Sequence, residues 1–311
     1  MVEFSQILPA WGRWQRAALT ERALPPLTCL QQAISPMGGG GFLLAAFALA
    51  ACAPIPAKQA NVTRPTLVSL NPCTDAILAE VADPAQLLAI SSYSHDPAAS
   101  SMDLATARRF PAVSGTVEEV LALRPDLVVG SSFTAPATAQ AMARLGLRLE
   151  RFGIATTVDE SKAQVRQLAA LAGHPERGEA LVARIDAALA ANRGPGGAPV
   201  AALVWQGGGI VPGAGSLIAD LLTRTGFSNA AAARGLGQAD QLPLEQVLAD
   251  PPALILFAGH GAGNEDRLLA HPALASLTGT RRERLDPALL WCGGPTIIRT
   301  ANRLGAIRRS L

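Results

Sequence analysis

One thirteen-residue pattern occurs twice in the chain and constrains the fold more than any other feature. "VEEVLALRPDLVV" spans Val117 to Val129, and "LEQVLADPPALIL" begins 127 positions later at Leu244. The glutamate, the apolar positions after it and the proline coincide in the two copies. The identical residues are Glu118 and Glu245, Val120 and Val247, Leu121 and Leu248, Ala122 and Ala249, Pro125 and Pro252, and Leu127 and Leu254.

Each copy predicts a short helix, a proline break and a buried strand. Proline lacks the backbone donor and disfavours helical geometry in the preceding residue, so the helix must stop before Pro125 and Pro252. The apolar run that follows has the length of a buried strand of a parallel sheet. Similar strand and helix patterns surround both copies, so we expect two pseudo-symmetric lobes.

The long helical stretch between the copies predicts the connection. "PERGEALVARIDAALAANRG" has a proline in its first turn, an acid early and Gly194 at its end, all typical of one continuous helix. Alternating strands and helices on either side indicate parallel sheets covered on both faces. The predicted fold is therefore α/β, with two Rossmann-like lobes joined by a single long helix.

The N-terminal region predicts export and lipidation. "FLLAAFALAAC" is too short to span a bilayer but has the length of a signal-peptide core. Leu49-Ala50-Ala51-Cys52 resembles a bacterial lipobox, which makes Cys52 the expected lipidation site; a plain secretory signal cut nearby and a non-cleaved anchor are the alternatives. Positive charges lie far upstream, so Met37 is a candidate for the true start. The predicted segments are a signal and lipobox region at 1–52, a tether at 53–64, an N-terminal lobe at 65–173, the linking helix at 174–194 and a C-terminal lobe at 198–311.

Several functional classes lack their motifs. The net charge is only +2 and no basic stripe carries interleaved aromatics, so nucleic acid is not an expected partner. The chain has no G-x-S-x-G nucleophile elbow, no phosphate-binding P-loop and no H-x-x-x-H or C-x-x-C metal pair. "AGHGAGNE" departs from the dinucleotide fingerprint at Asn264. We expect no catalytic residues, no resident metal and no cofactor.

The residues that follow the predicted strands are the candidate ligand contacts. Open parallel sheets bind ligands beyond the carboxyl ends of their strands, and two facing lobes would bring those ends to one cleft. Aromatic rings at strand ends suit a large planar ligand. The predicted ligand-binding residues are Cys73, Tyr93, His95, Phe133, Trp205, Trp291 and Cys292.

Cys73 and Cys292 are expected on opposite lobes. Export would place them in an oxidising compartment where they can pair. Three alternatives stay open at this point: a disulfide across the cleft, thiolates that contact a ligand or metal (with His95 nearby), or two inert buried side chains.

The chain resembles the periplasmic substrate-binding proteins of ABC importers for vitamin B12, haem and ferric siderophores. The resemblance runs from about Arg64 to the end, through "LVSLNPCTDAIL", both copies of the repeat, "PERGEALVARIDAAL" and "CGGPTIIRTANRL". It implies two lobes bridged by a rigid helix, with small closure on ligand capture. It also implies that Glu118 and Glu245, one on each lobe, dock onto arginines of the permease.

The expected function follows from that resemblance. The protein would capture a metal chelate, such as a corrinoid, ferric siderophore or haem, and deliver it to an ABC permease with its ATPase. We expect a periplasmic, lipid-anchored monomer. The aromatic-rich loops of B12 binders are replaced here by "AVSGT" and "GQADQL", so the ligand stays open. The alternatives are a metal-dependent enzyme that uses Cys73, His95 and Cys292, or a ligand-sensing lipoprotein without a transporter.

Overall fold

The computed structural model describes residues 64–259 and 270–311. The predicted signal, lipobox and tether, including Cys52, lie outside the described residues, and so does most of the "GHGAG" loop. Within the described residues, no helix combines the length and the apolar character needed to cross a membrane.

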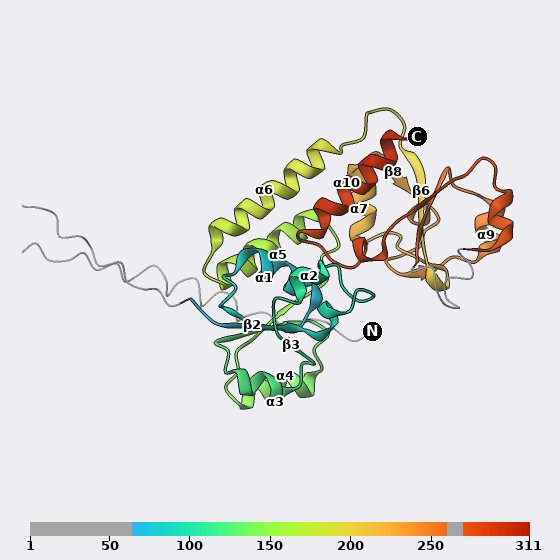
Figure 1. Cartoon of the computed structure of the whole chain (residues 1–311). Helices are drawn as coiled ribbons and strands as arrows, with labels where there is room; N and C mark the ends of the chain where they lie inside the picture. The colour runs from blue at the N-terminus through green and yellow to red at the C-terminus, as the bar shows by residue number, and fades with distance from the viewer. Residues whose placement is uncertain (1–63, 260–269) are drawn as a thin grey trace, which may run out of the picture. The chain divides into compact units, whose positions relative to one another are not determined.

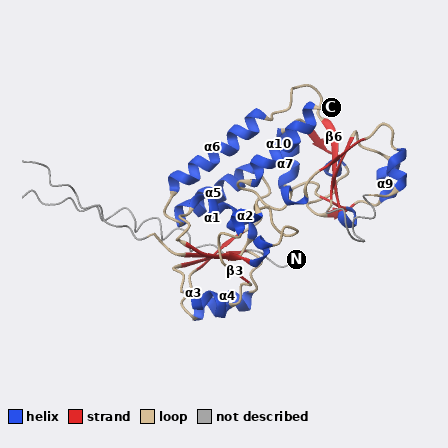
Figure 2. Ribbon diagram, viewed as in Figure 1, coloured by secondary structure: helices blue, strands red, loops and turns tan. Residues whose placement is uncertain are grey.

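The described chain forms two α/β lobes with α6 between them in sequence (Figures 1 and 2). The first lobe contains β1 (Leu67–Ser69), α1 (Pro72–Val81), β2 (Leu87–Ser91), the 3₁₀ turn η1 (Ser92–His95), α2 (Leu104–Ala107), β3 (Ala112–Val113), α3 (Val117–Leu123), β4 (Leu127–Ser131), α4 (Pro136–Arg144), β5 (Leu149–Phe152) and α5 (Val158–Leu171). The linking helix α6 spans Pro175–Ala191. The second lobe contains β6 (Val200–Gln206), η2 (Gly207–Gly209), β7 (Ile210–Val211), α7 (Leu217–Arg224), β8 (Phe227–Asn229), α8 (Ala230–Ala233), β9 (Asp240–Gln241), α9 (Leu244–Ala249), β10 (Leu254–Ala258), η4 (Pro272–Ser276), β11 (Arg281–Arg284), η5 (Pro287–Leu289) and α10 (Thr296–Arg309).

The two main sheets share the order of four strands. The first sheet runs β3-β2-β1-β4-β5 and the second runs β11-β10-β6-β8, and every pairing within them is parallel. When β6 is matched to β1, β8 corresponds to β2, β10 to β4 and β11 to β5. The repeated sequence therefore occupies equivalent places, as α3–β4 in one lobe and α9–β10 in the other. The predicted α/β fold with two parallel-sheet lobes is confirmed.

Local sequence explains how the helices begin and end. The Thr116 side chain caps α3 by accepting from the Glu119 amide, and Arg124 adopts a left-handed conformation (φ 49°) just before Pro125. Helix α1 is capped by Asn71, whose Oδ1 accepts from the Cys73 amide at 2.9 Å. Thr74 lies inside the first turn and donates its hydroxyl to the Asn71 carbonyl oxygen.

Strand residues alternate between two apolar layers. In the first lobe, Leu67 and Leu127 belong to the large central core, whereas Val68 and Val128 pack outward with α3 and α4. The second lobe repeats this arrangement, with alternate residues of β6 and β10 on the central and outer faces. This alternation follows from the two-residue period of a strand and covers both faces of each sheet with helices.

The central core continues from one lobe into the other. Residues of α1, α5, α6, α7 and α10 all contribute buried side chains to it, and the helices form one layer between the two sheets (Figure 2). Besides α6, polar contacts also join the lobes: the Val158 amide at the start of α5 donates to Asp220 Oδ2 of α7 at 2.8 Å. The helix layer therefore fixes where the carboxyl ends of the strands lie.

Candidate functional site

A cleft lies where strands of the two sheets end. Asn71 follows β1, Ser131 ends β4, Gly153 follows β5 and Gln206 ends β6, and all four line the same cavity of about 510 Å³. The second lobe adds the start of α7 and the loop before α10. This is the position at which parallel α/β sheets bind ligands, and the volume is within the usual range for small-molecule sites.

Four of the predicted ligand contacts line this cleft: Cys73, Phe133, Trp291 and Cys292. Phe133 is 74% exposed and Trp291 44% exposed, so both rings present apolar surface. They come from opposite lobes, Phe133 after β4 and Trp291 from the loop between η5 and α10. Two such rings suit a ligand with a flat, partly apolar body.

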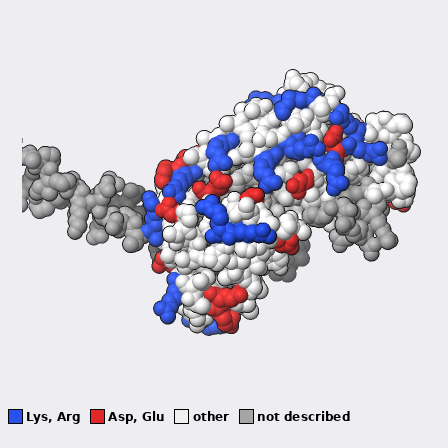
Figure 3. Space-filling model, viewed as in Figure 1, with Lys and Arg blue, Asp and Glu red and all other residues white. Residues whose placement is uncertain are grey.

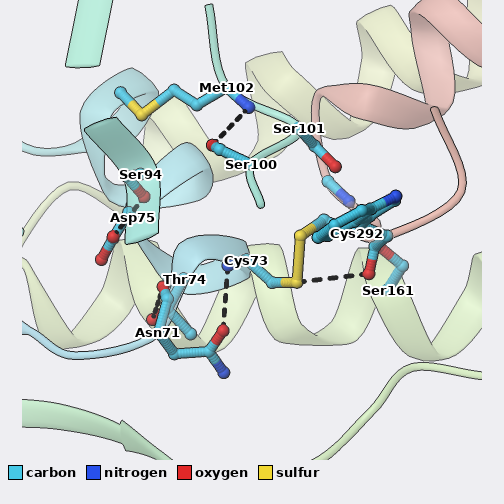
Figure 4. Close-up of a disulfide and its surroundings, with 12 residues drawn as sticks. Asn71, Cys73, Thr74, Asp75, Ser94, Ser100, Ser101, Met102, Ser161 and Cys292 are labelled. Carbon is cyan, nitrogen blue, oxygen red and sulfur yellow. Dashed lines mark hydrogen bonds between the residues drawn. A yellow bond between two sulfur atoms is a disulfide. The ribbon is translucent and has the colours of Figure 1, made fainter. Parts of the chain in front are cut away.

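Cys73 and Cys292 form a disulfide between the lobes (Figure 4). Cys73 is the second residue of α1 and Cys292 lies just before α10, and the bond joins positions 219 residues apart with a Cα–Cα distance of 5.0 Å. Because each sulfur is bonded to the other, neither is a thiolate ligand. The structure thus selects the disulfide among the three alternatives.

Trp205 does not contact the cleft. Its side chain is fully buried in the outer core of the second lobe, where its ring centroid lies 6.4 Å from that of Phe257. The ring was expected at the end of its strand and in the cleft, but β6 continues to Gln206. Trp205 therefore shares the outer face with Leu203, and the expected ligand contact is wrong. The next residue, Gln206, points to the other face and lines the cavity.

Tyr93 and His95 lie in η1, outside the residues that line the cavity. Tyr93 is 62% exposed, and its role stays a prediction. His95 is occupied by its own lobe: its Nε2 lies 3.1 Å from the Ala107 carbonyl oxygen and 3.2 Å from that of Phe110. Because these backbone carbonyls already satisfy the ring nitrogen, His95 holds η1 against its own lobe rather than facing a ligand.

The described lining is uncharged. Its polar side chains are four amides and two serine hydroxyls, and none of the described lining residues is ionisable once the cysteines are bonded. The polar members are Asn71, Ser131, Gln164, Gln206, Ser216 and Gln238. No group of three or more His, Cys, Asp or Glu side chains that could hold a metal occurs among the residues that the structure describes.

The four amides are not among the predicted ligand-binding residues, which were chosen for their rings and thiols. Asn71 and Gln206 do lie in stretches expected to follow strands, whereas Gln164 belongs to α5 rather than to a strand end. Gln238 lies in the stretch between α8 and β9. A signal for Gln206 was present in the alternation of β6, since it is out of phase with Leu203 and Trp205.

One carboxyl group behind the cleft is fully buried. Asp75 of α1 accepts from the Ser91 amide at 2.9 Å and from the Ser94 hydroxyl at 2.6 Å, and its Oδ1 has no partner (Figure 4). Burial raises the pKa of Asp75 to about 7, although the neighbouring polar groups of Ser69, Ser94 and Ser91 oppose the rise. Asp75 ties α1 to η1, so it supports the strand end that carries Tyr93.

Glu118 and Glu245 lie away from the cleft on the outer helices. Both are exposed, and each is the second residue of its helix, α3 or α9. Acidic side chains gather over α3, whereas acidic and basic side chains are interspersed along α6 (Figure 3). Neither glutamate forms a side-chain hydrogen bond or ion pair within the described part of the chain.

Two lobes of parallel sheet with a ligand-sized cleft at their strand ends define a binding protein of the two-lobed type. The model of the family "Periplasmic binding protein" matches residues 67–285. The chain belongs to this family, whose members are binding proteins rather than enzymes.

Solved structures support the same fold. A periplasmic heme-binding protein, RhuT of Roseiflexus sp. RS-1, is 23% identical and has a TM-score of 0.59, covering 79% of this chain and 97% of its own. The heme-binding HutB of Vibrio cholerae is 18% identical with a TM-score of 0.62, over 78% and 98%. The vitamin B12-binding BtuF of Vibrio cholerae is 18% identical with a TM-score of 0.59, over 79% and 96%. No curated protein matches the chain.

Proposed function

We propose that the protein captures a neutral metal chelate, foremost a cobalamin-type corrinoid, and delivers it to an ABC permease in the periplasm. The family supports ligand capture, and the three neighbours named above bind heme or vitamin B12, so their names do not choose between these ligands. The chelate would be the cargo rather than a resident cofactor.

The uncharged, amide-bearing lining of the cleft is the observation that favours a corrinoid over haem. Haem brings two carboxylates and takes an axial protein ligand such as histidine, tyrosine or a cysteine thiolate. None of the described lining residues offers a cation or such a ligand. A corrinoid is rich in amide groups, which exchange hydrogen bonds with Asn71, Gln206 and Gln238, while Trp291 and Phe133 cover its flat body.

Calorimetric titration tests this choice directly. Cyanocobalamin should bind as one ligand per chain with a dissociation constant of about 1 μM or lower. Hemin should bind at least about tenfold more weakly, because its carboxylates lose solvation without gaining a cation. Ferrichrome, a neutral ferric siderophore without a corrin or haem ring, tests whether binding depends on the charge of the ligand or on its ring. Tighter binding of hemin, with the absorption change of an axial ligand, would overturn the corrinoid assignment.

The exposed glutamates support delivery to a permease. A two-fold symmetric membrane partner needs one docking contact on each lobe, and Glu118 and Glu245 supply equivalent ones on α3 and α9. Charges at such positions act mainly on encounter and orientation. A ligand sensor that works without a transporter would not need them.

Anchoring is a separate part of the proposal. Cys52 is the lipidated residue, after cleavage behind Leu49-Ala50-Ala51. Metabolic labelling with a palmitate analogue should mark the wild-type protein and leave Cys52→Ala unlabelled and released from the membrane fraction. Labelling of Cys52→Ala equal to that of the wild type would contradict the assignment.

A further inference from the structure

The interlobe disulfide is attached to the same loop that carries Trp291. This loop, residues 290–295, joins η5 to α10, and Trp291 directly precedes Cys292. The Trp291 carbonyl oxygen lies 3.5 Å from Cys73 Sγ. The covalent link to α1 is therefore one residue away from the exposed ring that lines the cleft.

The two glycines after Cys292 lay the loop directly on the first lobe. The Gly294 amide donates to the buried Ser161 hydroxyl of α5 at 2.7 Å. A Cβ on Gly293 would overlap Ser161, and one on Gly294 would overlap Ile77 of α1, where φ is also +58°. Only glycine allows this close approach. The loop is thus held tightly on the carboxyl side of Cys292.

The Trp291 ring, on the amino side of Cys292, is held less firmly by its own contacts. Trp291 is 44% exposed, and its indole makes no hydrogen bond to any residue in the described ranges. The disulfide is a covalent restraint on the backbone next to it. A ring that is already held in its binding orientation loses less conformational entropy when a ligand stacks on it.

We propose that Cys73 and Cys292 are a positioning pair for ligand capture, and that their disulfide holds the Trp291 ring at the wall of the cleft. The effect on affinity rests on the proposed function. The position of the ring does not, because it is measurable in the ligand-free protein.

The first experiment follows the ring without ligand. The full chain is labelled with 5-fluorotryptophan, and the ¹⁹F signals of Trp291 and Trp205 are assigned from the Trp291→Phe and Trp205→Phe variants. Dithiothreitol donates two electrons and two protons, so that the S–S bond breaks, two thiols form and the reagent closes to its own disulfide. The Trp291 signal should shift and broaden, the Trp205 signal should stay, and reoxidation should restore both.

The double variant Cys73→Ser with Cys292→Ser is a second way to remove the disulfide. In each sample the free thiols are counted by alkylation and mass spectrometry. An unchanged Trp291 signal in both the reduced protein and the double serine variant overturns the proposal. If either route lowers the stability of the protein, the spectra are recorded at a temperature below its unfolding transition, and the same criterion applies.

The second experiment is a double-mutant cycle with cyanocobalamin as the probe. The double serine variant should bind about tenfold more weakly, and the same change in a Trp291→Ala background should cause little further loss, because coupled residues are not additive. Additive losses of affinity would show that the disulfide affects binding independently of Trp291. Val120→Ala, which removes buried side-chain atoms on the far face of the first sheet, is the control for lower stability with unchanged affinity. If the wild type binds no cyanocobalamin, the proposed function fails, and the ¹⁹F result alone decides this inference.

Discussion

Glu118 and Glu245 occupy the same position in the two lobes, each as the second residue of a short helix that leads into the strand beside the first strand of its lobe. The equivalence extends to the proline after each helix and to the parallel pairing of β4 with β1 and of β10 with β6. The repeat preserves an exposed carboxylate together with buried apolar residues, as the proposed docking of one partner onto both lobes requires.

Removal of both glutamates should separate transport from ligand binding. Glu118→Ala with Glu245→Ala should lower uptake by at least about tenfold, because the electrostatic docking contacts are lost, while ligand affinity is unchanged. Uptake by cells and calorimetry on the purified variant measure the two effects. Gln246→Ala, an exposed truncation beside Glu245, is the matched control. Full uptake by the double variant would remove these residues from the docking surface.

The two described tryptophans should respond in opposite ways to truncation. Trp205→Ala should lower the free energy of unfolding by about 3–5 kcal/mol, because it leaves a cavity in the outer core. Trp291→Ala should lower it by less than about 1 kcal/mol yet weaken cyanocobalamin binding by about tenfold. Urea unfolding and calorimetry give the two quantities. A stable Trp205→Ala protein with impaired binding would reverse our assignment of the two rings.

Asp75 should make stability fall as the pH rises. Its pKa is about 7 in the folded chain against an ordinary value of 3.8, so between these values the folded state holds a proton that the unfolded state has released. The stabilisation is fully present below pH 3.8 and is lost as the pH passes about 7. The difference of about three pKa units corresponds to at most about 4 kcal/mol.

Asp75→Asn isolates this contribution. At about pH 5 the variant should be less stable than the wild type, because its amide NH₂ replaces the unpartnered Oδ1 in a buried site. By about pH 8 the gap should close or reverse, because the wild type then carries a buried charge. Urea unfolding of both proteins at the two pH values gives the comparison. A gap that does not change with pH would refute the raised pKa.

The fold was predictable from the sequence because its signals are local. Proline breaks, apolar runs and the repeated segment determine helix ends and buried strands, and those determine two parallel sheets. The linking helix was equally clear, and α6 begins at Pro175 as a first-turn proline requires.

The site was only partly predictable because residues near a strand end still alternate between the two faces of the sheet. Trp205 and Gln206 both lie at the end of β6, but Trp205 packs in the outer core and Gln206 lines the cleft. The disulfide pairing depends on how the lobes meet, which no local pattern specifies. Gln164 was missed for the same reason, since it reaches the cleft from α5 in the helix layer.

Hydrogen exchange with and without cyanocobalamin tests the central claim most directly. The account predicts protection in both lobes at once, in residues 71–73 and 153–155 of the first lobe and in residues 216–218 and 290–293 of the second, with α3 and α9 unaffected. Protection confined to one lobe, or centred on the outer helices, would contradict a cleft in which the two sheets share one ligand.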